Sequence, residues 1–398
     1  MRSELSTREL RRLATLSLSV LATYAILIYS GLNGAGLPMG DLNFAYQNWM
    51  NSNVAFGLSA DWVYPWVAIL PMWLANAVSP GALLWPWLIG SGLITLVVAV
   101  TIAYREASTK AYLAMYFWLA SLLLLGPVSI SRLDTVSVAL AVVAVYLLSR
   151  GSEVSAAIWL SVATWIKVWP VAALVALMAA TKRKVNLLLV IVSVNLAILL
   201  IGFVLGADSS VFSFLGGQTG RGLQIEAPIA AFWLWPAVFG DSGFGIQYSS
   251  AMITYEVVGP NIKIFADLMS LVQIGALGIT LALGLVALRK GAKATDVFFW
   301  TLFTGTLDLI VFNKVGSPQY MTWLVVPIVY GILLSVERIQ MVAVGVLVLS
   351  ALTWLIYPVL YSGLLQSGFG ETFALTLRNV LLVLGLVYAN LRLQKLGK

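Results

Sequence analysis

The side chains available for chemistry in this 398-residue chain are restricted, because histidine and cysteine are both absent. Without histidine the commonest general base and metal ligand is missing, and no Ser-His-Asp triad can form. Without cysteine there is no thiol nucleophile, zinc finger or disulfide framework. Any catalysis must therefore use carboxylates, lysine, arginine, tyrosine or the backbone.

Asp41 is the carboxylate with the most suggestive position. It lies in a turn rich in glycine and proline that follows the first long apolar run. A carboxylate in such a place can act as a general base toward a hydroxyl group. The alternative is that Asp41 caps a helix over residues 42–50, because aspartate is a favoured N-cap residue. The two roles are compatible.

Two basic residues stand where the sequence suggests a cavity. Lys167 directly precedes the break Val168-Trp169-Pro170 in an apolar segment. Arg221 lies in the polar stretch 218–226 with a glycine on each side, which lets the backbone approach a ligand closely. Both side chains could bind an anion such as a phosphate. The alternatives are a snorkelling lysine and an ordinary solvated loop.

Two further connections between apolar segments carry charge. Lys314 and Ser317 stand just before Pro318, and lysine, serine and backbone amides near a helix N-terminus form an anion site. An ordinary turn would explain the serine and the proline, but not the lysine. Arg132 and Asp134 share another short connection, where they either pair with each other or line a polar cavity.

The composition of the chain indicates its fold class. Apolar residues make up 61% of the chain and charged residues only 10%, whereas a soluble protein carries about 25% charged residues. We therefore expect an all-α, polytopic integral membrane protein. A soluble enzyme, a disordered chain and a nucleic-acid-binding protein are excluded, despite the net charge of +7. The predicted spans cover about 13–31, 82–103, 111–128, 135–149, 185–206, 263–288, 295–312, 319–335, 340–360 and 371–390.

Shorter apolar segments complete the expected organisation. The pieces at 155–166 and 169–181 are predicted to form two short helices, because Pro170 interrupts them. The sequence predicts one domain over 1–398, and its outer parts are a first loop over 32–63, interfacial helices over 64–78 and 227–240, and a second loop over 207–262.

The basic residues predict the orientation of the chain. Cytoplasmic loops are enriched in lysine and arginine, and a cytoplasmic N-terminus places 17 of the 23 basic residues on that side. This arrangement needs about twelve crossings, a retained first helix rather than a cleaved signal peptide, and cytoplasmic termini. An anionic ligand would explain the basic residues left on the outer side, which are Arg132, Lys167, Arg221, Lys263, Lys314 and Arg378. For Lys263 and Arg378, contact with lipid headgroups is an equal alternative.

Several motifs occur in an order that resembles the glycosyltransferase family 87 proteins. They are Asp41 with Tyr46, Tyr64-Pro65, Arg132-Leu133-Asp134, Ile166 to Pro170, Arg221 to Glu226, and Lys314 to Tyr320. This family has the GT-C membrane fold and includes polyprenol-phosphate-mannose-dependent α-1,2-mannosyltransferases and related arabinofuranosyltransferases. The resemblance covers nearly the whole chain, with Pro65-Trp66 in place of the family's usual doubled proline.

The resemblance implies a plasma-membrane enzyme that acts on the extracytoplasmic side. It would transfer a sugar, most simply mannose, with inversion from a polyprenyl-phosphate donor to a glycolipid or lipoglycan acceptor. Asp41 would be the general base, and Lys167, Arg221, Lys314 and Arg132 would bind the donor phosphate. The residues implied to bind or orient the sugar or the acceptor are Tyr46, Asp134, Gln224, Glu226, Ser317, Gln319 and Tyr320. No metal or cofactor is needed, since lysine and arginine can hold the phosphate, and the partners are the two substrates and membrane lipids, with no nucleic acid.

Two other functions stay open at this point. The donor sugar could be arabinofuranose instead of mannose. A transporter or flippase would also explain many helices and intramembrane charges, and such proteins often contain broken helices. The unusual charges of this chain gather on one side, next to long outer loops, which favours a one-sided active site.

Overall fold

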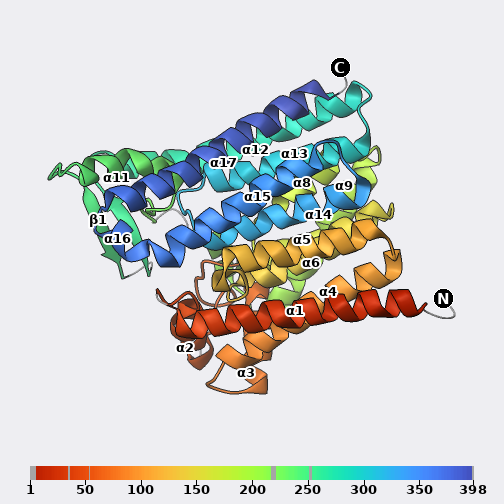
Figure 1. The fold of residues 1–398 in the computed structure, drawn as a ribbon, viewed down its shortest axis with the longest axis horizontal. Coiled ribbons are helices and arrows are strands. Elements are labelled where there is room, and N and C mark those ends of the chain that lie inside the picture. The colour runs from red at the N-terminus through yellow and green to blue at the C-terminus, as the bar shows by residue number, and fades with distance from the viewer. Residues whose placement is uncertain (1–5, 35, 53, 217–220, 251–252, 397–398) are drawn as a thin grey trace.

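The computed structural model describes residues 6–34, 36–52, 54–216, 221–250 and 253–396. Long helices dominate the molecule and run side by side along its long axis (Figure 1). Seven of the described helices are long and apolar enough to cross a membrane. They are α1 (Thr7–Asn33), α4 (Leu84–Glu106), α9 (Lys184–Val204), α12 (Ile262–Arg289), α13 (Ala294–Val311), α15 (Ile339–Trp354) continued by the π-helical turn η7 (Leu355–Val359), and α17 (Phe369–Lys395). The expectation of an all-α polytopic membrane protein is confirmed.

Shorter apolar helices fill the rest of the bundle. They are α5 (Thr109–Leu125), α6 (Leu133–Ser149), α7 (Glu153–Ile166), α8 (Val171–Ala180) and α14 (Val325–Leu334). The predicted break is present between α7 and α8, because Pro170 lacks the N–H that a continuous helix needs, and it directly precedes the first turn of α8. The segment predicted as a span from about 319 begins instead as the 3₁₀ turn η6 (Pro318–Leu324), and α14 follows it.

The two ends of the helical bundle differ. Both termini lie near one end (Figure 1). The other end carries the short elements, among them the segments predicted to lie along the interface. These elements are α2 (Gln47–Asn51), α3 (Ile69–Val78) after η2 (Trp66–Ala68), η3 (Pro127–Ser129), η4 (Ser209–Phe212), α10 (Ser213–Gly216), α11 (Ala231–Val238) after η5 (Pro228–Ala230), and α16 (Tyr361–Leu365).

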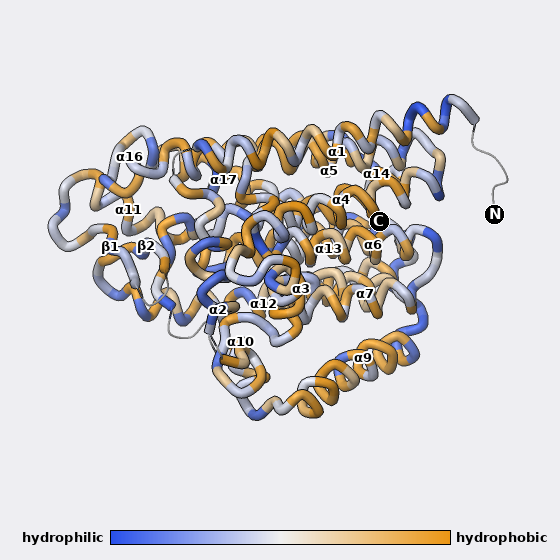
Figure 2. Tube along the Cα trace, turned by 90° about the horizontal axis from the view of Figure 1, so that it is seen from below, coloured by the Kyte–Doolittle hydropathy of each residue, from blue (hydrophilic) through white to orange (hydrophobic). Residues whose placement is uncertain are grey.

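Burial separates inner helices from outer ones. In α13, 83% of the most apolar window is buried inside the protein, whereas in α9 only 11% is. Figure 2 shows α9 as a separate apolar rod along one edge of the molecule. An exposed helix that is apolar on every side suits contact with lipid, because water would not solvate it.

A two-stranded antiparallel hairpin lies within the predicted outer loop 207–262. Its strands are β1 (Gly245–Ser249) and β2 (Thr254–Val258), with Gln247 opposite Glu256. The hairpin was not predicted from the sequence. Its second strand also bonds to the segment that follows Arg221, since the Val257 N–H donates to the Leu223 carbonyl and the Ile225 N–H donates to the Tyr255 carbonyl.

Candidate active site

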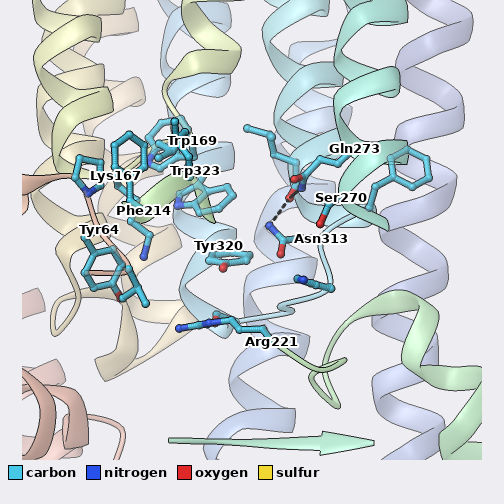
Figure 3. A pocket seen from close by; sticks show the side chains of 18 of the residues that line it. Tyr64, Lys167, Trp169, Phe214, Arg221, Ser270, Gln273, Asn313, Tyr320 and Trp323 are labelled. Carbon is cyan, nitrogen blue, oxygen red and sulfur yellow. Dashed lines mark hydrogen bonds between the residues drawn. The ribbon is translucent and has the colours of Figure 1, made fainter. Parts of the chain in front are cut away.

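A cavity of ≈ 500 Å³ opens at the end of the bundle that carries the short elements. Its walls come from both halves of the chain: the segment before η2, the break between α7 and α8, α10, α12, and the connection from α13 to η6. Figure 3 shows Lys167 and Tyr64 on one side and Ser270, Gln273 and Asn313 on the other. Six of the predicted site residues line this cavity: Lys167, Arg221, Lys314, Ser317, Gln319 and Tyr320.

Lys167 is fixed by an acidic partner at the helix break. It ends α7 in an extended conformation, and its Nζ lies 3.2 Å from Oδ2 of Asp134 and 4.7 Å from the ring centre of Tyr64. Burial by itself lowers the pKa of the Lys167 ammonium, but the Asp134 carboxylate together with Tyr64 and Tyr320 outweighs burial and holds that pKa above its ordinary value. The lysine is therefore charged and held inside the protein rather than snorkelling to the surface.

Asp134 connects Lys167 to an aromatic wall. Its side chain is buried, and its Oδ1 accepts a hydrogen bond of 2.6 Å from Trp323 Nε1. The Trp323 ring stacks on Tyr320 and on Trp169, with ring centres 4.1 and 5.6 Å away. The expected alternative that Arg132 and Asp134 pair with each other is wrong, because Asp134 pairs with Lys167 and Arg132 pairs with Asp41.

Arg221 and Lys314 are brought together by backbone contacts of the hairpin. The Gly222 N–H donates to Oε1 of Glu256, and a Cβ at Gly222 would come within 2.4 Å of the same carboxylate and would force the Glu256 side chain to move. The Gln224 N–H then donates to the Lys314 carbonyl. The other flanking glycine of Arg221 lies outside the described residues.

Lys314 is buried and forms no ion pair with the described residues. The residue is only 4% exposed, and its Nζ has no hydrogen-bond partner among the described residues. Burial lowers the pKa of the Lys314 ammonium, and the nearby Arg221 adds to the effect, whereas Asp267 opposes it. A buried and unpaired ammonium is costly, so this end of the cavity favours an anionic ligand.

Asp41 and Arg132 form an ion pair beside the cavity rather than in its walls. Asp41 begins the π-helical turn η1 (Asp41–Tyr46), where its side chain makes no capping hydrogen bond, so the expected N-cap role is wrong. The Asp41 side chain is 39% exposed, and that of Arg132 is 9% exposed. Burial lowers the pKa of the Arg132 guanidinium. Tyr46 is buried, and its hydroxyl accepts a hydrogen bond of 3.2 Å from the Leu133 N–H.

The model of glycosyltransferase family 87 matches residues 62–313. The chain belongs to glycosyltransferase family 87. The match includes Lys167 and Arg221 and ends directly before Lys314, and Asp41 lies outside it. The resemblance read from the motifs is thereby confirmed, and the chain is a membrane glycosyltransferase. A comparison with the curated proteins gives no match.

Two predicted residues of this family 87 transferase are buried but do not line the cavity. Gln224 is buried beside the hairpin, and Glu226 is 3% exposed, with Oε1 accepting a hydrogen bond of 2.9 Å from the Tyr361 hydroxyl. Burial raises the pKa of the Glu226 carboxyl. Arg378 Nη2 donates to the Glu226 carbonyl at 2.8 Å, so Arg378 is buried inside the protein and not placed among lipid headgroups. Lys263 is exposed.

The transferase cavity also contains polar residues that sequence reasoning missed. Ser270 and Gln273 of α12 line it, and Gln273 Nε2 donates to the Leu309 carbonyl at 2.9 Å. A signal was present, because the two residues are polar, lie in a mostly apolar helix and are three positions apart, which puts them on one face.

Proposed function

We propose that this family 87 transferase uses a polyprenyl monophosphate sugar as donor and transfers the sugar to a hydroxyl group of a glycolipid or lipoglycan. The proposed site is the cavity described above, on the extracytoplasmic side of the plasma membrane. Mannose is the proposed sugar, with α-1,2-mannosyltransferases of the family as the precedent, and arabinofuranose is the alternative.

The observation that carries this proposal is the convergence of three cations on one cavity. Lys167, Arg221 and Lys314 come from distant parts of the chain and all line it. Among the described residues, only Lys167 of the three has an acidic side chain within ion-pair distance. Two positive charges are therefore left to a ligand, and a phosphodiester monoanion, which becomes a dianion when it leaves, suits them.

The remaining walls suit the lipid part of the donor. Phe214 and Leu215 of α10 and Ile274 of α12 line the cavity, and Leu215 and Ile274 are also exposed on the apolar outside of the bundle. A prenyl chain can leave between these helices into the bilayer while the phosphate stays at the cations. The rings of Trp169, Trp323 and Tyr320 stack on one another and form an aromatic wall of the cavity.

The proposed chemistry is a single displacement with inversion. Asp41 removes the proton from the acceptor hydroxyl, and the oxygen attacks the anomeric carbon from the face opposite the phosphate. The bond between that carbon and the phosphate oxygen breaks, its electron pair goes to the leaving polyprenyl phosphate, and the proton on Asp41 passes to water. Fixed cations stabilise the added negative charge in the transition state.

The orientation proposed for the site follows from charge and geometry together. The positive-inside rule assigns most basic residues to the end of the bundle that holds both termini. The cavity lies at the opposite end, where the short elements gather. A cytoplasmic N-terminus and C-terminus therefore accord with an extracytoplasmic active site.

The decisive experiment is transfer by the purified, reconstituted protein. Polyprenyl-phosphate mannose and polyprenyl-phosphate arabinofuranose are supplied separately with a membrane glycolipid extract, and the product is analysed for the sugar and its anomeric configuration. We expect an α-mannoside from the β-linked mannosyl donor. Transfer of arabinofuranose alone would replace mannose by the alternative sugar, and use of a nucleotide-sugar donor instead would overturn the polyprenyl-phosphate assignment.

A further inference from the structure

The loop that carries Asp41, residues 36–46, is held by three consecutive residues at the start of α6. Ser131 Oγ donates to the Pro38 carbonyl at 3.1 Å, Arg132 pairs with Asp41, and the Leu133 N–H donates to the Tyr46 hydroxyl at 3.2 Å. These contacts fix the loop from one side. The next residue of α6, Asp134, bonds to Lys167 in the cavity wall.

A tyrosine from the far end of the chain holds the same loop from the other side. The Tyr357 hydroxyl donates to the Gly36 carbonyl at 3.2 Å. The same side chain lies near enough to Arg132, the partner of Asp41, for the two groups to interact electrostatically. Gly36 has a φ of +78°, and a Cβ there would come within 2.6 Å of Pro358, so the loop and the Tyr357 turn are in tight contact.

We propose that Tyr357 is a positioning residue for Asp41 and acts through Arg132 and Gly36. This inference rests on the proposed role of Asp41 as the base. Arg132 has Asp41 as its ion-pair partner and the Tyr357 side chain as a neighbour, and both restrict the conformations that the guanidinium can adopt. A base held in one orientation loses less entropy on reaching the transition state.

The assignment is to the hydroxyl of Tyr357 rather than to its ring. The ring packs against Tyr361, with ring centres 4.9 Å apart at 89°. Phenylalanine keeps that packing and removes only the hydroxyl, with its hydrogen bond to Gly36 and its interaction with Arg132. Tyr361 supplies a matched control, because it belongs to the same turn but its hydroxyl donates to Glu226, away from the Asp41 loop.

The first measurement needs no substrate. Amide hydrogen exchange is compared in the full-length wild type, Tyr357→Phe and Tyr361→Phe. We expect Tyr357→Phe to speed exchange in residues 36–46 at least threefold and to leave residues 223–227 unchanged, and Tyr361→Phe to do the reverse. Unchanged exchange in residues 36–46 of Tyr357→Phe overturns the proposal, whichever donor the enzyme uses.

The second measurement separates positioning from a structural role. With the donor that the wild type uses, we expect Tyr357→Phe to lower kcat about tenfold and to change the donor KM by no more than about twofold. The acidic limb of the pH–rate profile should move to higher pH, because a less firmly held Arg132 stabilises the Asp41 carboxylate less. Tyr361→Phe should leave that limb in place. The effects of Tyr357→Phe and Arg132→Lys should also be far from additive, because both act on one contact.

The outcomes remain distinct from those that test the proposed function. If Tyr357→Phe and Tyr361→Phe shift the limb equally, or if the two substitutions at 357 and 132 simply add, Tyr357 does not act through Arg132. If the wild type transfers no sugar from a polyprenyl phosphate, the proposed function fails, and the exchange measurement still decides whether Tyr357 holds the loop.

Discussion

Nζ of Lys167 lies 3.2 Å from Oδ2 of Asp134, and Asp134 stands two positions along the chain from the arginine that pairs with Asp41. The first residues of α6 thus connect the Asp41 carboxylate with the cationic wall of the cavity. Arg132 pairs with Asp41, and Asp134 pairs with Lys167. A displacement of this helix end would change the distance between the proposed base and the proposed phosphate site.

Replacement of Asp41 tests the proposed base. We expect Asp41→Asn to lower kcat by a factor of about 10² to 10⁴, the usual contribution of a general base. Donor binding should persist, because Asp41 does not line the cavity. The measurement is product formation by the reconstituted protein together with equilibrium binding of the donor. Wild-type turnover in Asp41→Asn would remove Asp41 as the base.

Replacement of Lys314 tests the phosphate site. A hydrogen bond to a charged group contributes about 1.5–3 kcal/mol, so we expect Lys314→Ala to weaken donor binding about tenfold to a hundredfold. Lys263→Ala is the matched control, because Lys263 is exposed and outside the cavity. Equal donor affinities in the two variants would contradict the assignment of Lys314 to the phosphate.

The lowered pKa of Lys314 predicts a pH dependence of donor binding. Lysine is charged below its pKa, and burial brings that pKa below the ordinary value of about 10.4. Donor affinity should therefore be complete well below this lowered pKa and fall as the pH rises through it. A phosphodiester does not titrate in this range, so the fall reports on the protein. In Lys314→Arg the affinity should stay flat, because arginine keeps its charge, and the same alkaline fall in that variant would argue against Lys314.

The pair of Asp134 and Lys167 predicts a stability effect. Removal of one partner of a buried ion pair costs about 3–5 kcal/mol, so Asp134→Leu should lower the thermal unfolding temperature in detergent. The double variant Asp134→Leu with Lys167→Met should recover much of that loss, since no charge is left unpaired. Donor binding should stay weak in the double variant. Recovery of both properties would show that Lys167 is structural only.

From local signals in the sequence we could predict residues that line the cavity, but not the contacts between distant residues around it. The proline after Lys167 and the charge of Lys314 between two apolar segments are visible in a few residues of sequence, and both side chains line the cavity. The pairing of Asp41 with Arg132 was not predictable, because it depends on how α6 meets a loop far away in the sequence. Charge alone equally allowed Arg132 to pair with Asp134.

The hairpin was missed for a related reason. Its strands are five residues each, and they lie in a stretch rich in glycine and polar residues that resembles a loop. The β-branched and aromatic residues of β2, from Thr254 to Val258, were the available signal. β2 holds the segment after Arg221 by backbone hydrogen bonds. These contacts join distant parts of the chain, so no local sequence pattern predicts them.

The contacts of the Tyr357 turn also have a consequence for biosynthesis. Tyr357 donates a hydrogen bond to the Asp41 loop, and Tyr361 donates one to Glu226. The last quarter of the chain therefore contacts segments that are translated much earlier. The ribosome has therefore released most of the helices before the proposed base is held on both sides. We expect the nascent protein to stay inactive in the membrane until its final helices are inserted, which would prevent a partly made enzyme from consuming its donor.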